Sequence, residues 1–388
     1  MEVYILDNLF RRTAVLDRYQ SLIWTERFAG YGDFELVVHS TPENRKLLTP
    51  GTKFVVNESD RVQTIENYEN KKDDEGKLML KLTGRSLEQI LEDRVATSGM
   101  IGLTADTDWV LTGTPGDICR QIFQKICVDG ILSTGDIIPF MTAGTTYPVD
   151  TISETSTVVQ AAIPISSVYD AIREMCEVYD LGFRLYRNQD TSQLYFNVYA
   201  GSDRTTRQTT LPAVVFSSDL DNLSNETELS SISEAKNMAY VFAQNGALIV
   251  YADGYSADTV GFNRRVLYID ATDVDEPAGA TLTSILTNKG KDALAKARPL
   301  QAFDGEVSQY GAYKYGVDYR LGDLVEVRNS DGVASMMRVT EQIFVSDSEG
   351  ERSYPTLSLN LFITPGSWSS WDYGSQWQDE TIKHWDDA

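Results

Sequence analysis

Short runs of alternating apolar and polar residues dominate the first 95 residues. Leu78, Leu80 and Leu82 fall on one face of the run at 77–83, and a period of two is typical of a strand with one buried face. Turn signals such as Pro50–Gly51 separate the runs. We therefore expect a sandwich or small barrel over residues 1–95, which includes a short helix that Ser86 could cap and that ends near Asp93.

A helical period replaces the alternation in two segments of the next region. Thr114 and Pro115 suit the start of a helix with an apolar stripe through Ile126, and a second helix is expected over about 167–179. A hairpin should follow, with strands at 183–187 and 194–199. The segment 130–166 is rich in Thr, Ser, Gly and Pro, so we expect a long connection there.

Strand patterns return from about residue 205. Asn245–Gly246 between two apolar runs predicts a tight hairpin, and residues 281–298 predict a helix broken or weakened at Gly290 and ended by Pro299. The fold expected is mainly β with an α+β insertion. Two β-rich domains, 1–95 and 205–362, should flank a smaller α/β region at 96–204, and a tail should follow at 363–388.

Charge and composition narrow the possible partners. The 388 residues include 34 Lys and Arg against 57 Asp and Glu, a net charge of −23, which disfavours nucleic-acid or anionic-membrane ligands. The N-terminus lacks the pattern of a signal peptide, and no stretch reaches the ~20 apolar residues of a membrane helix. We expect synthesis and folding in a cytoplasm, with Cys119, Cys127 and Cys176 reduced and packed as small hydrophobic residues.

Catalytic motifs are not found in the sequence. The only two histidines are His39, after a strand, and His384, in the acidic tail, and neither suits a catalytic base held in a fixed geometry. Carboxylate pairs stay possible because acidic residues are abundant. No cofactor is expected, and one weak calcium candidate has the short-loop carboxylates that Ca²⁺ prefers, although a solvated connection explains it as well: Asp270, Asp273, Asp275 and Glu276.

Four of the six tryptophans lie in the acidic tail: Trp368, Trp371, Trp377 and Trp385. An indole is costly to leave in water, because it can bury roughly 150–250 Å². The tail therefore either folds back on its own chain or docks on a partner through these residues, and stacking on carbohydrate is a third use.

The order of short motifs along the chain resembles the siphophage tail-tip, or baseplate hub, family, whose members are often described as minor tail proteins. The most specific motif is Gly316–Val327, which contains Asp318, Tyr319, Leu321, Gly322 and Asp323. The others are Asp17–Leu22, Arg27–Phe28, Gly32–Leu36, Leu47–Gly51, Leu82–Leu87, Leu181–Arg184, Asn222–Leu223, Asn245–Gly246, Arg265–Ala271, Arg338–Glu341 and Tyr354–Leu357.

This resemblance implies a structural virion protein, not an enzyme. Such hubs are similar to the central hub of contractile-tailed phage baseplates: a homotrimer with two β-barrel-like, tail-tube-related domains per chain. The implied partners are the distal tail protein, the tape measure protein and, in some cases, a tail fibre or receptor-binding protein. DNA would leave through the channel without specific binding, so we expect a negative channel wall. The implied location is the virion tail tip, after assembly in the host cytoplasm.

Two other function classes stay open from the sequence. A host-surface carbohydrate- or receptor-binding tail protein would use the aromatic residues, which make up 10% of the chain. A cell-wall hydrolase would use two of the many carboxylates across a cleft.

Overall fold

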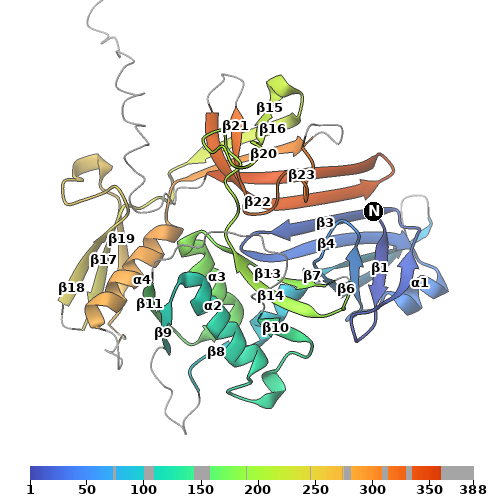
Figure 1. Ribbon diagram of the computed structural model, residues 1–388, viewed down its shortest axis with the longest axis horizontal. Helices are drawn as coiled ribbons and strands as arrows, with labels where there is room; N and C mark the ends of the chain where they lie inside the picture. Colours follow the sequence, from blue (N-terminus) through green and yellow to red (C-terminus); the bar gives the residue numbers. More distant parts are fainter. Residues whose placement is uncertain are drawn as a thin grey trace, which may run out of the picture.

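The computed structural model describes residues 1–72, 76–99, 109–143, 158–188, 190–244, 246–272, 274, 281–307, 313–328 and 334–359. Within these ranges, thirteen strands drawn from both ends of the chain form one sheet. Figure 1 shows the C-terminal strands, in red, lying beside the N-terminal strands, in blue. The mainly β fold class predicted from the sequence is confirmed.

The N-terminal part of this sheet curls around one apolar core. All seven strands contribute to that core, including Trp24 and Phe54, which are fully buried and pack edge to face. Since strands at both ends of the series share the core, this part is barrel-like. The strands are β1 (Val3–Leu6), β2 (Arg12–Leu16), β3 (Ser21–Arg27), β4 (Gly30–His39), β5 (Lys53–Val56), β6 (Gln63–Lys72) and β7 (Leu78–Ser86), with α1 (Pro42–Leu47) between β4 and β5.

The long strand β22 (Ala334–Asp347) joins this part to the C-terminal strands. Strand β23 (Gly350–Leu359) occupies one edge of β22. The other edge pairs first with β21 (Leu324–Arg328) through residues 334–338 and then with β3 through residues 341–346. A β-bulge lies between Val339 and Glu341, where the partner changes. Strands β3 and β21, which are about 300 residues apart in the sequence, thus pair with the same strand.

The remaining C-terminal strands complete a second apolar core. Phe216 and Tyr319 are fully buried in it and meet edge to face at 5.3 Å between ring centroids. Strand β15 pairs with β21 in parallel, and β20 and β16 extend the sheet beyond β23. Their bounds are β15 (Val215–Ser217), β16 (Leu223–Ser231) and β20 (Leu300–Val307).

The middle region is a small α/β layer packed below the sheet (Figure 1). Helices α2 (Pro115–Phe123) and α3 (Val168–Tyr179) start as predicted, because Thr114 Oγ1 accepts from Asp117 N at 3.2 Å and Ser167 Oγ accepts from Asp170 N at 3.0 Å. All three cysteines are buried in this core. The strands are β8 (Val95–Ala96), β9 (Trp109–Gly113), β10 (Met141–Ala143), β11 (Val159–Ile163), β12 (Ser166–Ser167), β13 (Gly182–Arg187) and β14 (Leu194–Tyr199).

A three-stranded sheet with one helix stands at the edge of the molecule, and we name it the outlying unit. It consists of β17 (Met238–Ala243), β18 (Gly246–Tyr251), β19 (Val266–Asp270) and α4 (Leu282–Lys296). The predicted hairpin across residues 245–246 is confirmed by the pairing of β17 with β18. Helix α4 packs on one face of the sheet and reaches α3, where Lys296 Nζ lies 2.7 Å from Glu174 Oε1.

Three local predictions need correction. The helix at 281–298 is not broken at Gly290, because α4 runs through it, and the absence of a side chain there lets the helix approach Val250. Ser86 does not cap the following 3₁₀ helix, Leu87–Asp93, since its Oγ accepts from Gly32 N instead. The expected connection at 130–166 contains β10 and β11.

Candidate functional site

One residue, Phe28, connects the three regions of the chain through its main chain. It follows β3, and its N–H donates to the carbonyl of Thr340 at 2.8 Å, at the bulge of β22. Its own carbonyl accepts from Phe183 N at 3.0 Å, in β13. A single peptide segment therefore bonds to the C-terminal sheet on one side and to the middle region on the other.

The Phe28 ring fills a slot that only glycine can border. A Cβ on Gly182 would lie 2.3 Å from one ring carbon, and a Cβ on Gly322 would lie 2.4 Å from another. Such distances are far below van der Waals contact, which for carbon atoms is about 3.5–4.0 Å. Gly322 also has a φ of +89°, a conformation that other residues adopt only with strain. Three motifs of the resemblance, at 27–28, 181–184 and 316–327, thus meet at this ring.

Arg338 extends this contact with a buried guanidinium. Its charged group lies 5.3 Å from the centroid of the Phe28 ring, and it pairs with Asp180 at 2.5 Å. It also donates to the carbonyl of Gly322. Arg338 as a whole residue is 6% exposed, so the ion pair is largely screened from solvent and its loss would leave a charged group poorly solvated.

Asp323 fixes the turn that carries Gly322. Its two carboxylate oxygens accept from Ser202 N at 2.7 Å and from Arg320 N at 3.0 Å. Arg204 lies 3.6 Å from the same carboxylate. We name the whole set the Phe28 junction: Phe28, Asp180, Gly182, Gly322, Asp323 and Arg338.

The other residues of the 316–327 motif support the neighbouring core. Asp318 accepts from Lys314 N at 2.7 Å and so closes the turn. Tyr319 is fully buried, and its hydroxyl donates to Gln342 Oε1 at 3.3 Å, while Leu321 is buried in the same core. All five motif residues therefore hold the turn and its core in place.

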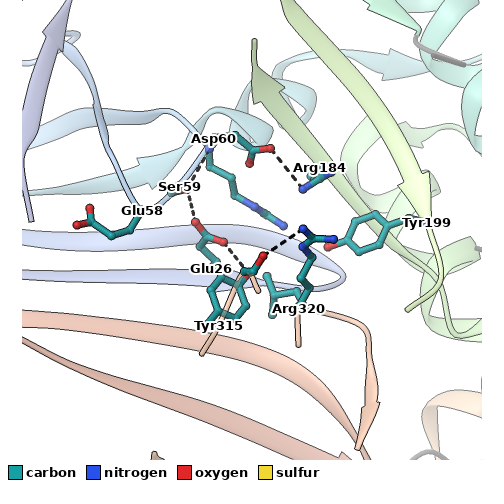
Figure 2. Close-up of a pocket in the computed structure, with 11 residues that line it drawn as sticks. Glu26, Glu58, Ser59, Asp60, Arg184, Tyr199, Tyr315 and Arg320 are labelled. Atoms are coloured by element: carbon teal, nitrogen blue, oxygen red, sulfur yellow. Dashed lines mark hydrogen bonds and ion pairs between the residues drawn. The ribbon is translucent and has the colours of Figure 1, made fainter. Parts of the chain in front are cut away.

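A polar cavity of about 140 Å³ lies beside the junction, where the same three regions meet. It is lined from β3 by Glu26, from the loop before β6 by residues 58–61, from β13 and β14 by Arg184 and Tyr199, and from residues 315–316 and 320–321. Figure 2 shows Asp60 facing Arg184 and the side chains of Glu26 and Tyr315 pointing toward one another. The volume is below the ~300 Å³ at which ligand pockets usually begin.

Glu26 is the most deeply buried carboxyl group of the cavity. It is 5% exposed and accepts from Trp24 Nε1 at 3.1 Å, from Ser59 Oγ and from the Tyr315 hydroxyl at 3.2 Å. Burial raises the pKa of Glu26 above its ordinary 4.5, although the nearby charge of Arg61 opposes the change. Burial also raises the pKa of Tyr315 well above its ordinary value.

Arg61 brings a positive charge to the same place. Burial works against this charge, but the carboxylate of Glu88, 2.9 Å away, holds the pKa of Arg61 above its ordinary value. Its guanidinium also donates to the carbonyl of Arg27 at 2.9 Å. Glu26, through Tyr315, and Arg61, through Glu88 and Arg27, are thus both already engaged in contacts within the folded chain.

Of the predicted metal and histidine residues, the structure describes Asp270 and His39, and neither lines the cavity. Asp270 accepts from Thr272 N and Oγ1 at 3.0 and 2.7 Å, whereas Asp273, Asp275 and Glu276 lie outside the described residues. Across the described ranges, no three His, Cys, Asp or Glu side chains gather closely enough to hold a metal ion. His39 is exposed at the end of β4. His384 and Trp368, Trp371, Trp377 and Trp385 lie outside the described residues.

Sequence reasoning missed the roles of Phe28, Glu26 and Arg61. The glycines at 182 and 322 carried a signal, since glycine inside an otherwise apolar motif often marks a close approach of two segments. Nothing local, however, indicated which ring they border, or which of the 57 acidic residues are buried.

Comparison with known proteins agrees with the fold. The family model of Siphovirus ReqiPepy6 Gp37-like proteins matches residues 2–357, whereas no curated protein matches the chain. In the part of the chain that the structure describes, no helix has the length and apolarity to cross a membrane.

Three solved structures share the architecture. A tail protein from Neisseria meningitidis MC58 gives a TM-score of 0.56 at 13% identity, covering 92% of this chain and 96% of that one. A 43 kDa tail protein of prophage MuSo2 from Shewanella oneidensis gives 0.54 at 11% identity, covering 92% and 97%. The prophage tail protein gp18 from Listeria monocytogenes EGD-e gives 0.50 at 10% identity, covering 93% and 95%. At these identities the likeness concerns the fold.

Proposed function

The chain belongs to the family of Siphovirus ReqiPepy6 Gp37-like proteins, and from this premise we propose that it is a structural protein of the phage tail, three copies of which form a ring at the tail tip. The family expected from the ordered motifs is confirmed. The proposed role is mechanical and involves no catalysis: the ring closes the end of the tail tube and opens when DNA leaves.

The Phe28 junction is the observation that carries this proposal. A tail-tip protein must transmit force between its attachment to the tube and its contacts below without coming apart. Phe28 belongs to the N-terminal region and hydrogen-bonds to the other two, and the shared strand β22 makes the two β-rich parts one sheet. The similar solved structures, one tail protein and two prophage tail proteins, support the same role.

Several partners follow from this role. The ring would meet the distal tail protein and the tape measure protein on the tube side, and a tail fibre or receptor-binding protein on the other. The net charge of −23 supports a channel that DNA passes without specific binding. We place the protein in the virion, at the tail tip, after assembly in the host cytoplasm.

Neither alternative function gains from the site. The cavity is smaller than a typical ligand pocket, and Glu26, its most buried acid, is engaged by Trp24, Ser59 and Tyr315. A hydrolase would instead need two carboxyl groups facing across space for a sugar and water.

Mass measurement tests the proposal directly. Native mass spectrometry is carried out on the purified full chain, alone and mixed with the distal tail protein of the same phage. Three copies of the chain, about 130 kDa or three times 43.3 kDa, should be present in the assembly, either by themselves or with the distal tail protein added to that mass. An antibody against the chain should label only the tip of intact tails in electron micrographs. A single copy of the chain in both samples, or antibody label along the tube, would contradict the proposal.

A further inference from the structure

The outlying unit covers one face of its sheet and leaves the other open. Ala239 and Val241 of β17 and Val250 of β18 point toward α4 and form a small core with it. Because side chains alternate along a strand, residues such as Tyr240 and Phe242 lie on the opposite face. Among the described residues, no helix or strand packs on that second face.

The open face is aromatic. Tyr240 is the register partner of Ile249 on one side and of Tyr268 on the other, so the three form a row across the sheet. Ile249 is 46% exposed and Tyr268 is 65% exposed. Phe242 continues the patch, with its ring 5.3 Å from that of Tyr268. We name these four residues the aromatic face.

A positive charge borders the aromatic face. The guanidinium of Arg264 lies 5.7 Å from the centroid of the Tyr240 ring and donates to its hydroxyl. The 3₁₀ turn at Gly261–Asn263, just before it, leaves the whole Phe262 side chain in solvent. Contiguous exposed apolar surface with a polar rim usually marks a binding surface, and this one would suit an aromatic and acidic ligand.

We propose that residues 360–388 of the same chain dock on the aromatic face. The position where the described chain ends is the first argument. Ser358, at the end of β23, pairs with Ala302 of β20, which follows α4 directly. Lys236 N donates to Ala297 O at 2.6 Å, so the segment just before β17 lies against the end of α4. The tail thus starts beside the base of the outlying unit.

The tail is long enough to reach the aromatic face. From Leu359 to Trp368 there are nine residues, which reach up to about 30 Å when extended, and the three further tryptophans have longer reach. A tether of this kind gives an effective concentration in the millimolar range. Weak contacts then suffice for docking within one chain.

Composition supplies the complementarity. Residues 360–388 contain four tryptophans and five acidic residues against one lysine. Indole rings can stack on Tyr268 and Phe242 and remove the exposed rings from water, while the acidic groups suit Arg264 and the adjacent Arg265. The other large apolar residues that are exposed are spread over several elements.

Fluorescence quenching in the full-length protein tests the docking. Of the six tryptophans, Trp24 and Trp109 are buried, so a change in quenching by acrylamide reports on the four in the tail. A double variant of the face, Phe242→Ser with Tyr268→Ser, should raise the quenching constant about twofold as the indoles become exposed. Val317→Ser is the matched control, because Val317 is exposed but lies on a distant turn; it should leave the constant unchanged.

A reciprocal measurement keeps the proposal testable if the double variant folds poorly. Replacing all four tail tryptophans by Ser leaves every described residue intact. Hydroxyl-radical footprinting should then show stronger labelling of Tyr268 than in the unaltered protein. Equal labelling in both, or equal quenching in the face variant and the unaltered protein, would overturn the docking.

Dilution identifies whose tail is bound. Docking within one chain predicts quenching that does not depend on protein concentration, and an increase on dilution would assign the contact to a second copy and overturn the proposal. The inference does not rest on the trimer, since a monomer could show it, so the two proposals fail separately.

Discussion

The Phe28 junction and the outlying unit both contain β-strands, but the junction is closely packed whereas the outlying unit leaves one face of its sheet exposed. At the junction, three distant segments approach so closely that Gly182 and Gly322 have no space for a Cβ. In the outlying unit, α4 covers one face of the sheet and the other keeps Tyr268 in solvent. The first arrangement holds the chain as one body, and the second leaves a surface for binding. Stability and binding therefore belong to different regions, and substitutions should separate them.

The largest loss of stability should follow Gly322→Ala. The new Cβ would meet the Phe28 ring at 2.4 Å in a backbone conformation with φ +89°. We expect the free energy of unfolding to fall by about 3–5 kcal/mol, because strain and overpacking act together. Urea denaturation followed by the fluorescence of the buried tryptophans measures the change.

Gly316→Ala is the matched control for this substitution. Gly316 belongs to the same motif and also has a positive φ, +81°, but no atom lies within 4 Å of its Cβ position. Only the backbone strain remains, about 1 kcal/mol. Equal losses for the two variants would mean that the Phe28 ring does not limit the space at residue 322.

Removal of the buried charge at the junction should have the next largest effect. Arg338→Met keeps most of the side-chain volume but leaves Asp180 and the Gly322 carbonyl without the guanidinium. The expected loss is about 2–3 kcal/mol by urea denaturation. Arg352→Met, on the same hairpin but in a more exposed ion pair with Asp347, should cost less than about 1 kcal/mol. The reverse order would contradict the importance of the junction.

A smaller effect, confined to the outlying unit, should follow Gly290→Ala. Alanine favours a helix over glycine by about 1 kcal/mol, yet its Cβ would lie 2.6 Å from Val250 Cγ2. Overpacking should outweigh the helix preference by about 1 kcal/mol. Hydrogen exchange of α4 amides should therefore speed up, whereas amides of β3 and β4 should be unaffected. Thr283→Ala, at an exposed position of α4, should slow exchange slightly; faster exchange there would point to a general weakness of the helix.

Local elements could be predicted from the sequence because local chemistry decides them. Thr114 and Ser167 cap their helices through their own side chains, and β17 and β18, the strands on either side of residue 245, pair with each other. The predicted break at Gly290 was wrong because only the low helix propensity of glycine was considered. In the structure, glycine at this position lets α4 pack closely against Val250 of the sheet. The alternation of apolar and polar residues predicts a strand but not the strand it pairs with, so the pairing of β22 with β3 was not predicted.

The candidate site was only partly accessible for the same reason. The motif at 316–327 was quoted from the sequence, and it meets two of the other quoted motifs at Phe28. Burial of Glu26 depends on Tyr315, which lies 289 positions away along the chain. A contact of that separation leaves no trace in periodicity, turn signals or composition.

The smallest effect concerns the charge beside the junction and depends on pH. Burial raises the pKa of Glu26 above the 4.5 of an exposed glutamate, with Arg61 opposing, so the folded state holds this proton more firmly than the unfolded chain does. The stabilisation is complete below the unfolded pKa and is lost as the pH rises through the folded pKa. The free energy of unfolding should thus decrease from about pH 4.5 toward neutrality on account of Glu26.

Glu26→Gln should remove this part of the pH dependence. Glutamine keeps an acceptor for Trp24 Nε1 and Ser59 Oγ but carries no charge to bury, so the variant should gain stability relative to the unaltered protein as the pH rises. Urea denaturation at several pH values measures the difference between the two curves. Glu43→Gln, at an exposed position of α1, should give a curve parallel to that of the unaltered protein. If the Glu26→Gln curve is parallel as well, the carboxyl group is solvated and the Phe28 junction is more open than its contacts indicate. If the curve diverges for Glu26→Gln alone, the region beside the Phe28 junction excludes water, in contrast to the exposed aromatic face.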